Sequence, residues 1–113
     1  REDYLMSTSL TLDTARGTDD KLVLIAVGEI DLSNIDAFNQ ALTAAATEAA
    51  SSGGTLTVDL SAIEYLDSAA INALYARAGQ IHLIAHPLLM SVLTMSGLTE
   101  LVTVEPAAPT TER

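Results

Sequence analysis

Cysteine and tryptophan are absent from the sequence, and Phe38 is its single phenylalanine. Without cysteine the chain has no disulfide, no thiolate chemistry and no zinc–thiolate site, a composition that fits a reducing, cytoplasmic compartment. Hydrophobic residues nevertheless make up 49% of the 113 residues, whereas aromatic residues make up only 4%. A disordered chain would be poorer in apolar residues. The sequence therefore predicts one small folded domain with an aliphatic core.

Basic residues are also scarce, because five Lys and Arg stand against fifteen Asp and Glu, which gives a net charge of −10. Five scattered cations cannot form a surface that follows phosphates, so nucleic acid and direct contact with an anionic membrane are excluded as partners. No basic residue lies between Lys21 and Arg77, whereas this stretch contains the acidic residues Glu29, Asp31, Asp36, Glu48, Asp59, Glu64 and Asp67. The acidic stretch is either a solvated surface or a docking surface for a basic protein.

The motifs of common enzymes and membrane proteins are missing as well. The sequence has no apolar run of the ~20 residues that a bilayer span requires, no Gly-x-Gly-x-x-Gly loop and no Gly-x-Ser-x-Gly turn. His82 and His86 are four residues apart, but they lie on a predicted strand and at its exit, and they have no acidic neighbour at ligand spacing. We therefore expect no metal, no cofactor and no catalytic activity.

Hydrophobic periodicity predicts an α/β fold with a mixed, mostly parallel sheet and helices packed against it. The predicted strands are residues 10–13, 22–27, 55–60, 81–85 and 101–104. The predicted helices start at Ser33 or Asn34, at Asp67-Ser68 and at Pro87, and they end at the Ser51–Gly54 stretch, near Gly79 and at Ser96. Residues 61–66 are expected to form a short connection, and the unbroken apolar run 22–27 is expected to be covered on both faces.

Several other positions receive structural interpretations. Met90 and Met95 are expected to pack in the core from the third helix, and Tyr65 and Tyr75 are expected to pack beside the helix that starts at Ser68. We expect a domain over residues 6–105, with residues 1–5 as a leader or an expression remnant. Residues 106–113 are expected to form a disordered tail.

Asp67-Ser68 precedes a predicted helix and follows the strand that contains Val58-Asp59-Leu60. Asp and Ser are preferred at helix starts because their side-chain oxygens accept hydrogen bonds from unpaired first-turn amides. From this position alone, the pair is interpreted as a helix cap.

The pattern Val58-Asp59-Leu60-Ser61-x-x-x-x-Leu66-Asp67-Ser68, together with the earlier Gly28-Glu29-Ile30-Asp31, resembles the STAS-domain family. This family includes the bacterial anti-sigma factor antagonists, and the resemblance covers roughly residues 22–101. It implies that Ser68 is phosphorylated by an anti-sigma factor that is itself a serine kinase. The family usually has glycine at the position of Ala70, and we expect the added methyl group to face the approaching kinase.

The resemblance implies a partner-binding surface around that serine, made of Glu29, Asp31, Ser33, Asn34, Asp67, Ser68, Ala69 and Ala70. The unphosphorylated chain would bind the anti-sigma factor and so free a sigma factor for transcription. A phosphate would add about −1.5 to −2 charges and switch the binding off. The resemblance further implies a phosphatase as a second partner and a monomer or weak dimer as the state of the chain.

Two other functions are left open by the sequence. The chain is alternatively a regulatory STAS module of an anion transporter or of a lipid-transport complex. A third hypothesis is that the domain itself binds a nucleotide.

Overall fold

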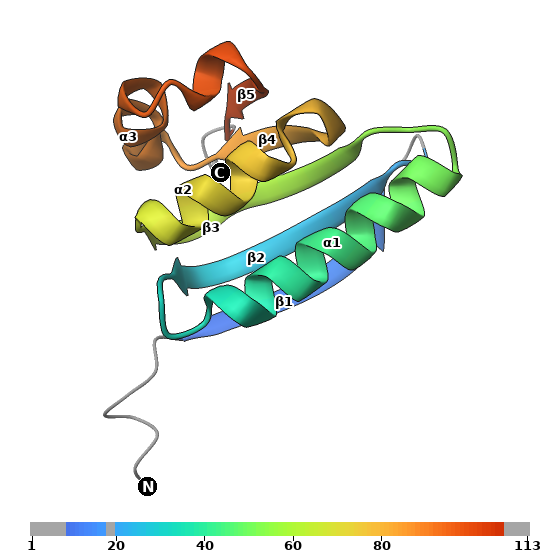
Figure 1. Cartoon of the computed structure of the whole chain (residues 1–113), viewed down its shortest axis with the longest axis horizontal. Helices are drawn as coiled ribbons and strands as arrows, with labels where there is room; N and C mark the ends of the chain where they lie inside the picture. The colour runs from blue at the N-terminus through green and yellow to red at the C-terminus, as the bar shows by residue number, and fades with distance from the viewer. Residues whose placement is uncertain (1–8, 18–19, 108–113) are drawn as a thin grey trace, which may run out of the picture.

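A five-stranded sheet forms the centre of the molecule, and the structure, a computed structural model, describes residues 9–17 and 20–107 (Figure 1). The strands lie in the order of the sequence: β1 (Leu10–Arg16), β2 (Leu22–Ile30), β3 (Leu56–Leu66), β4 (Ile81–Ala85) and β5 (Thr103–Pro106). β1 pairs antiparallel with β2, and the other three pairings are parallel. The predicted mixed, mostly parallel sheet is therefore confirmed.

Within the described residues, three α-helices and three short 3-10 turns connect the strands (Figure 1). The helices are α1 (Ile35–Ser51), α2 (Ser68–Ala76) and α3 (Met90–Met95), and the turns are η2 (Ala78–Gln80), η3 (Pro87–Leu89) and η4 (Leu98–Glu100). The predicted third helix is thus divided into a 3-10 turn and a short α-helix. Pro87 occupies the first position of η3, where its missing N–H has no consequence.

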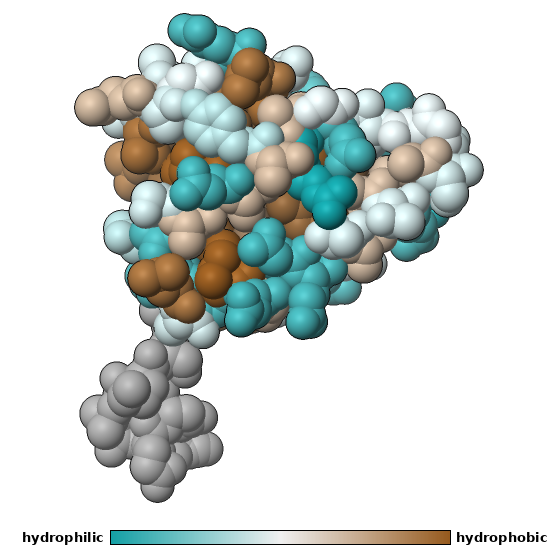
Figure 2. Space-filling model, in the orientation of Figure 1, coloured by the Kyte–Doolittle hydropathy of each residue, from teal (hydrophilic) through white to brown (hydrophobic). Residues whose placement is uncertain are grey.

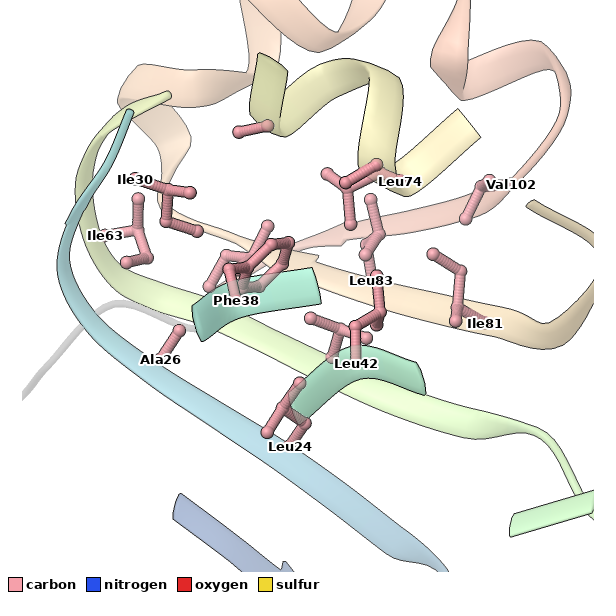
Figure 3. Packing of buried hydrophobic residues seen from close by; sticks show 14 of the residues in the cluster. Leu24, Ala26, Ile30, Phe38, Leu42, Ile63, Leu74, Ile81, Leu83 and Val102 are labelled. Carbon is pink, nitrogen blue, oxygen red and sulfur yellow. The ribbon is translucent and has the colours of Figure 1, made fainter. Parts of the chain in front are cut away.

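The core lies between the helices and one face of the sheet (Figure 3). Phe38 and Leu42 of α1 and Leu74 of α2 are completely or almost completely buried against strand residues such as Leu24 and Leu83. Among the described residues no polar or charged side chain is buried. The interior is therefore aliphatic around a single aromatic ring, as the composition predicts.

The second face of the sheet is not covered in the same way. In β2, Leu22 and Leu24 are buried, but Val23 and Ile25 are only half-buried and Val27 is exposed. The prediction that residues 22–27 are covered on both faces is wrong. An unbroken aliphatic run fits a central strand, but it does not by itself require a second layer of helices.

β3 is longer than predicted, because residues 61–66 continue the strand instead of forming a connection. The register between β2 and β3 shifts twice, between Ile25 and Val27 and between Gly28 and Glu29. Each shift inserts one extra residue into β3, as a β-bulge does. The buried side chains of this part are consequently Leu60, Ile63 and Leu66, at a spacing of three rather than two. This broken alternation hid the end of the strand from sequence analysis.

Other element boundaries also differ from the predictions. β2 continues to Ile30, so Gly28 and Glu29 lie within a strand. Pro106 belongs to β5, and the amide of Ala107 donates to the Ala85 carbonyl, so the predicted tail begins inside the sheet. Residues 1–5 and the remainder of the tail lie outside the described residues. In residues 9–17 and 20–107, no helix is both long enough and apolar enough to cross a bilayer.

Candidate functional site

Asp67 lies between β3 and α2 and caps the helix. Its Oδ1 accepts a hydrogen bond from the amide of Ala70 at 3.1 Å, which satisfies one of the unpaired first-turn donors. The capping interpretation is therefore confirmed for Asp67. Ser68, the first residue of α2, is exposed.

Asp67 also holds the segment that follows β2, a contact that sequence analysis did not predict. Its second oxygen, Oδ2, accepts a hydrogen bond from the amide of Leu32 at 3.1 Å. The amide of Asp67 donates to the Ile30 carbonyl at 3.2 Å. One carboxylate thus links the start of α2 to a loop 35 residues earlier in the chain.

The loop between β2 and α1 is folded by its own side chains. Asp31 Oδ1 accepts from the amide of Ser33 at 2.9 Å and from its hydroxyl at 2.6 Å. Asn34 Oδ1 accepts from the amide of Asp31 at 3.0 Å, and Asn34 Nδ2 donates to the Glu29 carbonyl at 2.9 Å. Asn34 occupies the N-cap position of α1, but its side chain does not cap the helix. The prediction that Ser33 or Asn34 caps α1 through its side chain is wrong, because both side chains bond within the loop.

Parallel pairing brings the two segments together. Ile30 is the partner of Leu66 in the register of β2 and β3, so Asp31 and Asp67 leave the sheet at the same edge. The carboxylate of Asp67 then joins the loop to Ser68 at the start of α2. Most of the residues assigned to the partner surface therefore lie at one end of the molecule.

Ala70 is a correction to that assignment. Its side chain is 0% exposed and forms part of the core, whereas the neighbouring Ala69 is half-buried. The methyl group that replaces the family's glycine points into the protein and not toward an approaching kinase. Its side chain therefore cannot contact a partner.

A shallow cavity of about 390 Å³ lies between the first turns of α2 and the outer side of α3. Ser68, Asp67 and Asn72 contribute polar groups to its lining, and the apolar part of the lining is Leu66, Ile71, Val92 and Met95. We call this cavity the α2–α3 groove. Sequence analysis missed it, because an apolar helix was taken as a core helix throughout.

Met95, predicted to pack in the core, and Tyr65, predicted to pack beside α2, lie at the surface instead. Met95 is 85% exposed, although Met90 of the same helix packs against the core as expected. Tyr65 is also exposed, whereas Tyr75 is half-buried and its hydroxyl donates to the carbonyl of Ser96. A six-residue helix places only some of its side chains inward, so its overall apolar character does not decide which ones.

The basic residues of the described part lie away from Ser68, whereas acidic residues occur at both ends of the sheet. Glu29, Asp31, Glu64 and Asp67 lie at the end where β2 and β3 finish. The described lysine and arginine residues lie toward the other end: Arg16 pairs with Leu22 at the start of β2, Lys21 precedes that strand, and Arg77 follows the end of α2. The end that carries Ser68 is consequently acidic.

The two histidines have different neighbours in the structure. His82 Nε2 lies 3.6 Å from a carboxylate oxygen of Glu105, an acidic neighbour that sequence analysis did not foresee. His86 Nδ1 accepts from the amide of Leu88 at 3.0 Å and so starts η3. Within residues 9–17 and 20–107, no group of three or more potential ligands gathers at one place.

One family model and several solved structures match this chain. The family described as "Mlab, STAS domain" matches residues 14–103. The structure is similar to that of an anti-sigma factor antagonist from Mycobacterium paratuberculosis, with 27% sequence identity, a TM-score of 0.76, and coverage of 88% of this chain and 87% of that chain. A comparison with curated protein sequences found no match.

Two further structures show the same fold at lower identity. The anti-sigma factor antagonist SpoIIAA in its unphosphorylated form has 17% identity and a TM-score of 0.65, over 87% of this chain and 89% of that chain. The Bacillus cell fate determinant SpoIIAA in its phosphorylated form has 16% identity and a TM-score of 0.60, over 87% and 92%. With the family match over most of its length, the chain belongs to the STAS-domain family.

Proposed function

We propose that the chain is an anti-sigma factor antagonist whose unphosphorylated form binds an anti-sigma factor of the serine-kinase class. The observation that carries the proposal is the exposed Ser68 at the capped start of α2, in a chain that resembles the Mycobacterium antagonist over most of both chains. The acidic end of the sheet supports it, because such a surface favours a partner with basic groups.

Phosphorylation of Ser68 would be the switch. The Ser68 Oγ attacks the γ-phosphorus of ATP held by the kinase, ADP leaves, and the hydroxyl proton passes to a base of the kinase. In this chain both oxygens of Asp67 already accept backbone hydrogen bonds. The neighbouring carboxylate is therefore a structural group, and the chain supplies the substrate hydroxyl while the kinase supplies the catalytic groups.

The added phosphate would change the surface without unfolding the domain. It brings about −1.5 to −2 charges to the N-terminal end of a helix, where backbone amides tolerate an anion. For the partner, however, it replaces a small hydroxyl by a charged group that would have to lose water when a partner surface closes over it. A partner that binds the hydroxyl form would therefore be released.

Labelling tests the assigned residue. The purified chain is incubated with ATP and each serine-kinase anti-sigma factor of the source genome, beside Ser68→Ala and the control Ser91→Ala. Ser91 is exposed and lies across the α2–α3 groove from Ser68. We expect label in the wild type and in Ser91→Ala and none in Ser68→Ala. Equal labelling of Ser68→Ala would contradict the assignment. Binding of the chain only to a transporter subunit would instead support the transporter alternative.

A further inference from the structure

We propose that the α2–α3 groove receives an apolar segment of the anti-sigma factor that is flanked by basic residues. This inference rests on the proposed function and assigns a part of the partner surface that lies outside the residues identified from sequence. It adds α3, and Val92 and Met95 in particular, to the binding surface.

The groove combines exposure with apolar chemistry. Met95 is 85% exposed and Val92 is 38% exposed, and Leu32, at 77%, lies in the loop that Asp67 fastens beside Ser68. Figure 2 shows apolar surface over α3 and beside the start of α1, at the end of the molecule where α2 begins. Val92 and Met95 line one cavity, and exposed apolar side chains that gather in this way mark interaction sites more often than isolated ones do.

The walls of the groove are held in place from behind. The Tyr75 hydroxyl, on the last turn of α2, donates to the carbonyl of Ser96, which follows α3. Gly97 has a φ of +84°, and a Cβ on it would lie 3.0 Å from the Tyr75 oxygen. The turn after α3 is therefore fitted closely to this tyrosine. Because α3 is fixed to α2 before any partner arrives, little ordering is needed on binding.

Charge selects the occupant. Neither α2 nor α3 carries a charged residue, whereas Asp31, Glu64 and Asp67 stand at the same end of the sheet. A second copy of this chain would bring a net charge of −10 and the same acidic residues toward them. A segment with apolar side chains and flanking Lys or Arg matches both parts of the surface.

The position of Ser68 on the groove lining explains why a single phosphate would be sufficient. Ser68 lines the same cavity as Ile71, Val92 and Met95. A phosphate there would place a dianionic group against the apolar part of the bound segment, whose burial requires dry contact. The phosphate would thereby oppose the apolar contact that holds the segment in the groove.

The test measures the affinity of the purified anti-sigma factor for five forms of the chain. They are the wild type, Met95→Gln, Val92→Gln, Ser68→Glu, and Leu101→Gln as the control. Leu101 is 57% exposed, but it borders a different cavity together with Lys21 and Thr55. We expect each groove variant to weaken binding by about tenfold or more, because apolar anchors dominate interface energies, and Leu101→Gln to bind within about twofold of the wild type.

The outcomes separate the two proposals. Wild-type affinity of both groove variants, with Ser68 still labelled, would overturn the groove and leave the antagonist function intact. Loss of affinity in the groove variants together with tight binding by Ser68→Glu would support the groove and contradict the charge switch. Binding by no anti-sigma factor would overturn both. A dimer of this chain that dissociates on Met95→Gln, measured by sedimentation, would assign the groove to a second copy and overturn the proposed occupant.

Discussion

The two ends of the sheet differ in the hydrogen bonds of their loops and in the residues that line their cavities. Where β2 and β3 finish, backbone amides are held by the side chains of Asp31, Asn34 and Asp67, and the α2–α3 groove is mostly apolar. At the opposite end a larger cavity of about 610 Å³ is lined by groups such as Lys21, Thr55 and His82. Cavity size therefore does not single out the candidate site. What distinguishes the candidate site is the exposed residue Ser68, which lies beside apolar surface at an acidic end of the sheet whose loops are held by hydrogen bonds.

Two glycines, one near each end of the sheet, compare how closely the backbone packs there. Replacing the first of them is expected to give the largest loss of unfolding free energy. Gly28 has a φ of +118°, and a Cβ would lie 2.3 Å from the Ser9 carbonyl oxygen, so Gly28→Ala is expected to cost about 3 kcal/mol or more of unfolding free energy. Gly79, at the opposite end, has open space around it, and Gly79→Ala should change stability by less than about 1 kcal/mol. Urea unfolding of both variants measures this, and equal losses would contradict the structure.

Asp67 gives the next effect. Asp67→Ala removes the helix cap and the link to Leu32, and we expect a loss of about 2 kcal/mol of unfolding free energy. The control is Asp13→Ala, since that exposed carboxylate accepts only from the adjacent Thr14 amide among the hydrogen bonds identified, and its loss should be below about 1 kcal/mol. Hydrogen exchange should also show faster exchange of the Leu32 amide in Asp67→Ala. An unchanged exchange rate would contradict the link.

Tyr75→Phe sharpens the comparison at the groove. The variant keeps the ring but removes the hydroxyl that bonds to the Ser96 carbonyl, so a loss of about 1 kcal/mol is expected. Amides of residues 90–96 should exchange faster, and the affinity for the anti-sigma factor should fall by a few fold. Unchanged exchange in this segment would show that Tyr75 does not fix α3.

The smallest effect is expected from the ion pair at the opposite end. Arg16 lies 3.2 Å from Glu48, and both side chains are well exposed to solvent. Arg16→Ala should therefore change the unfolding free energy by about 0.5 kcal/mol or less and leave partner affinity unchanged. Thermal unfolding and titration with the anti-sigma factor measure the two quantities. If Arg16→Ala lost as much affinity as the groove variants, the partner would bind at the end opposite Ser68, and the proposed docking surface would be contradicted.

Sequence patterns predicted the fold where a single rule governs it. The alternation of Leu56, Val58 and Leu60 identified the first half of β3, and Asp67 followed the helix-capping rule. The second half of β3 was missed because two bulges change the spacing of its buried residues. The pairing of Asp67 with Leu32 was missed because it joins residues that only the parallel sheet brings together.

The candidate site was predicted only in part, because some of its features depend on how distant segments pack. Family resemblance pointed to Ser68 and to the loop before α1, but it could not tell that the Ala70 methyl points inward or that Met95 points outward. Those directions depend on how a helix turns relative to its neighbours. A residue's apolar character alone does not fix this direction.

The central claim is that the partner docks at the end that carries Ser68 and is released by charge placed there. It is tested by titrating the anti-sigma factor with the wild type, Ser68→Glu and Gln80→Glu. Gln80 is exposed in η2 near the opposite end, so both variants add one negative charge. We predict that Ser68→Glu loses affinity by about 100-fold, because its carboxylate would have to lose water against the apolar part of the bound segment, and that Gln80→Glu binds as the wild type does. Tight binding by Ser68→Glu, or an equal loss in both variants, would contradict the account.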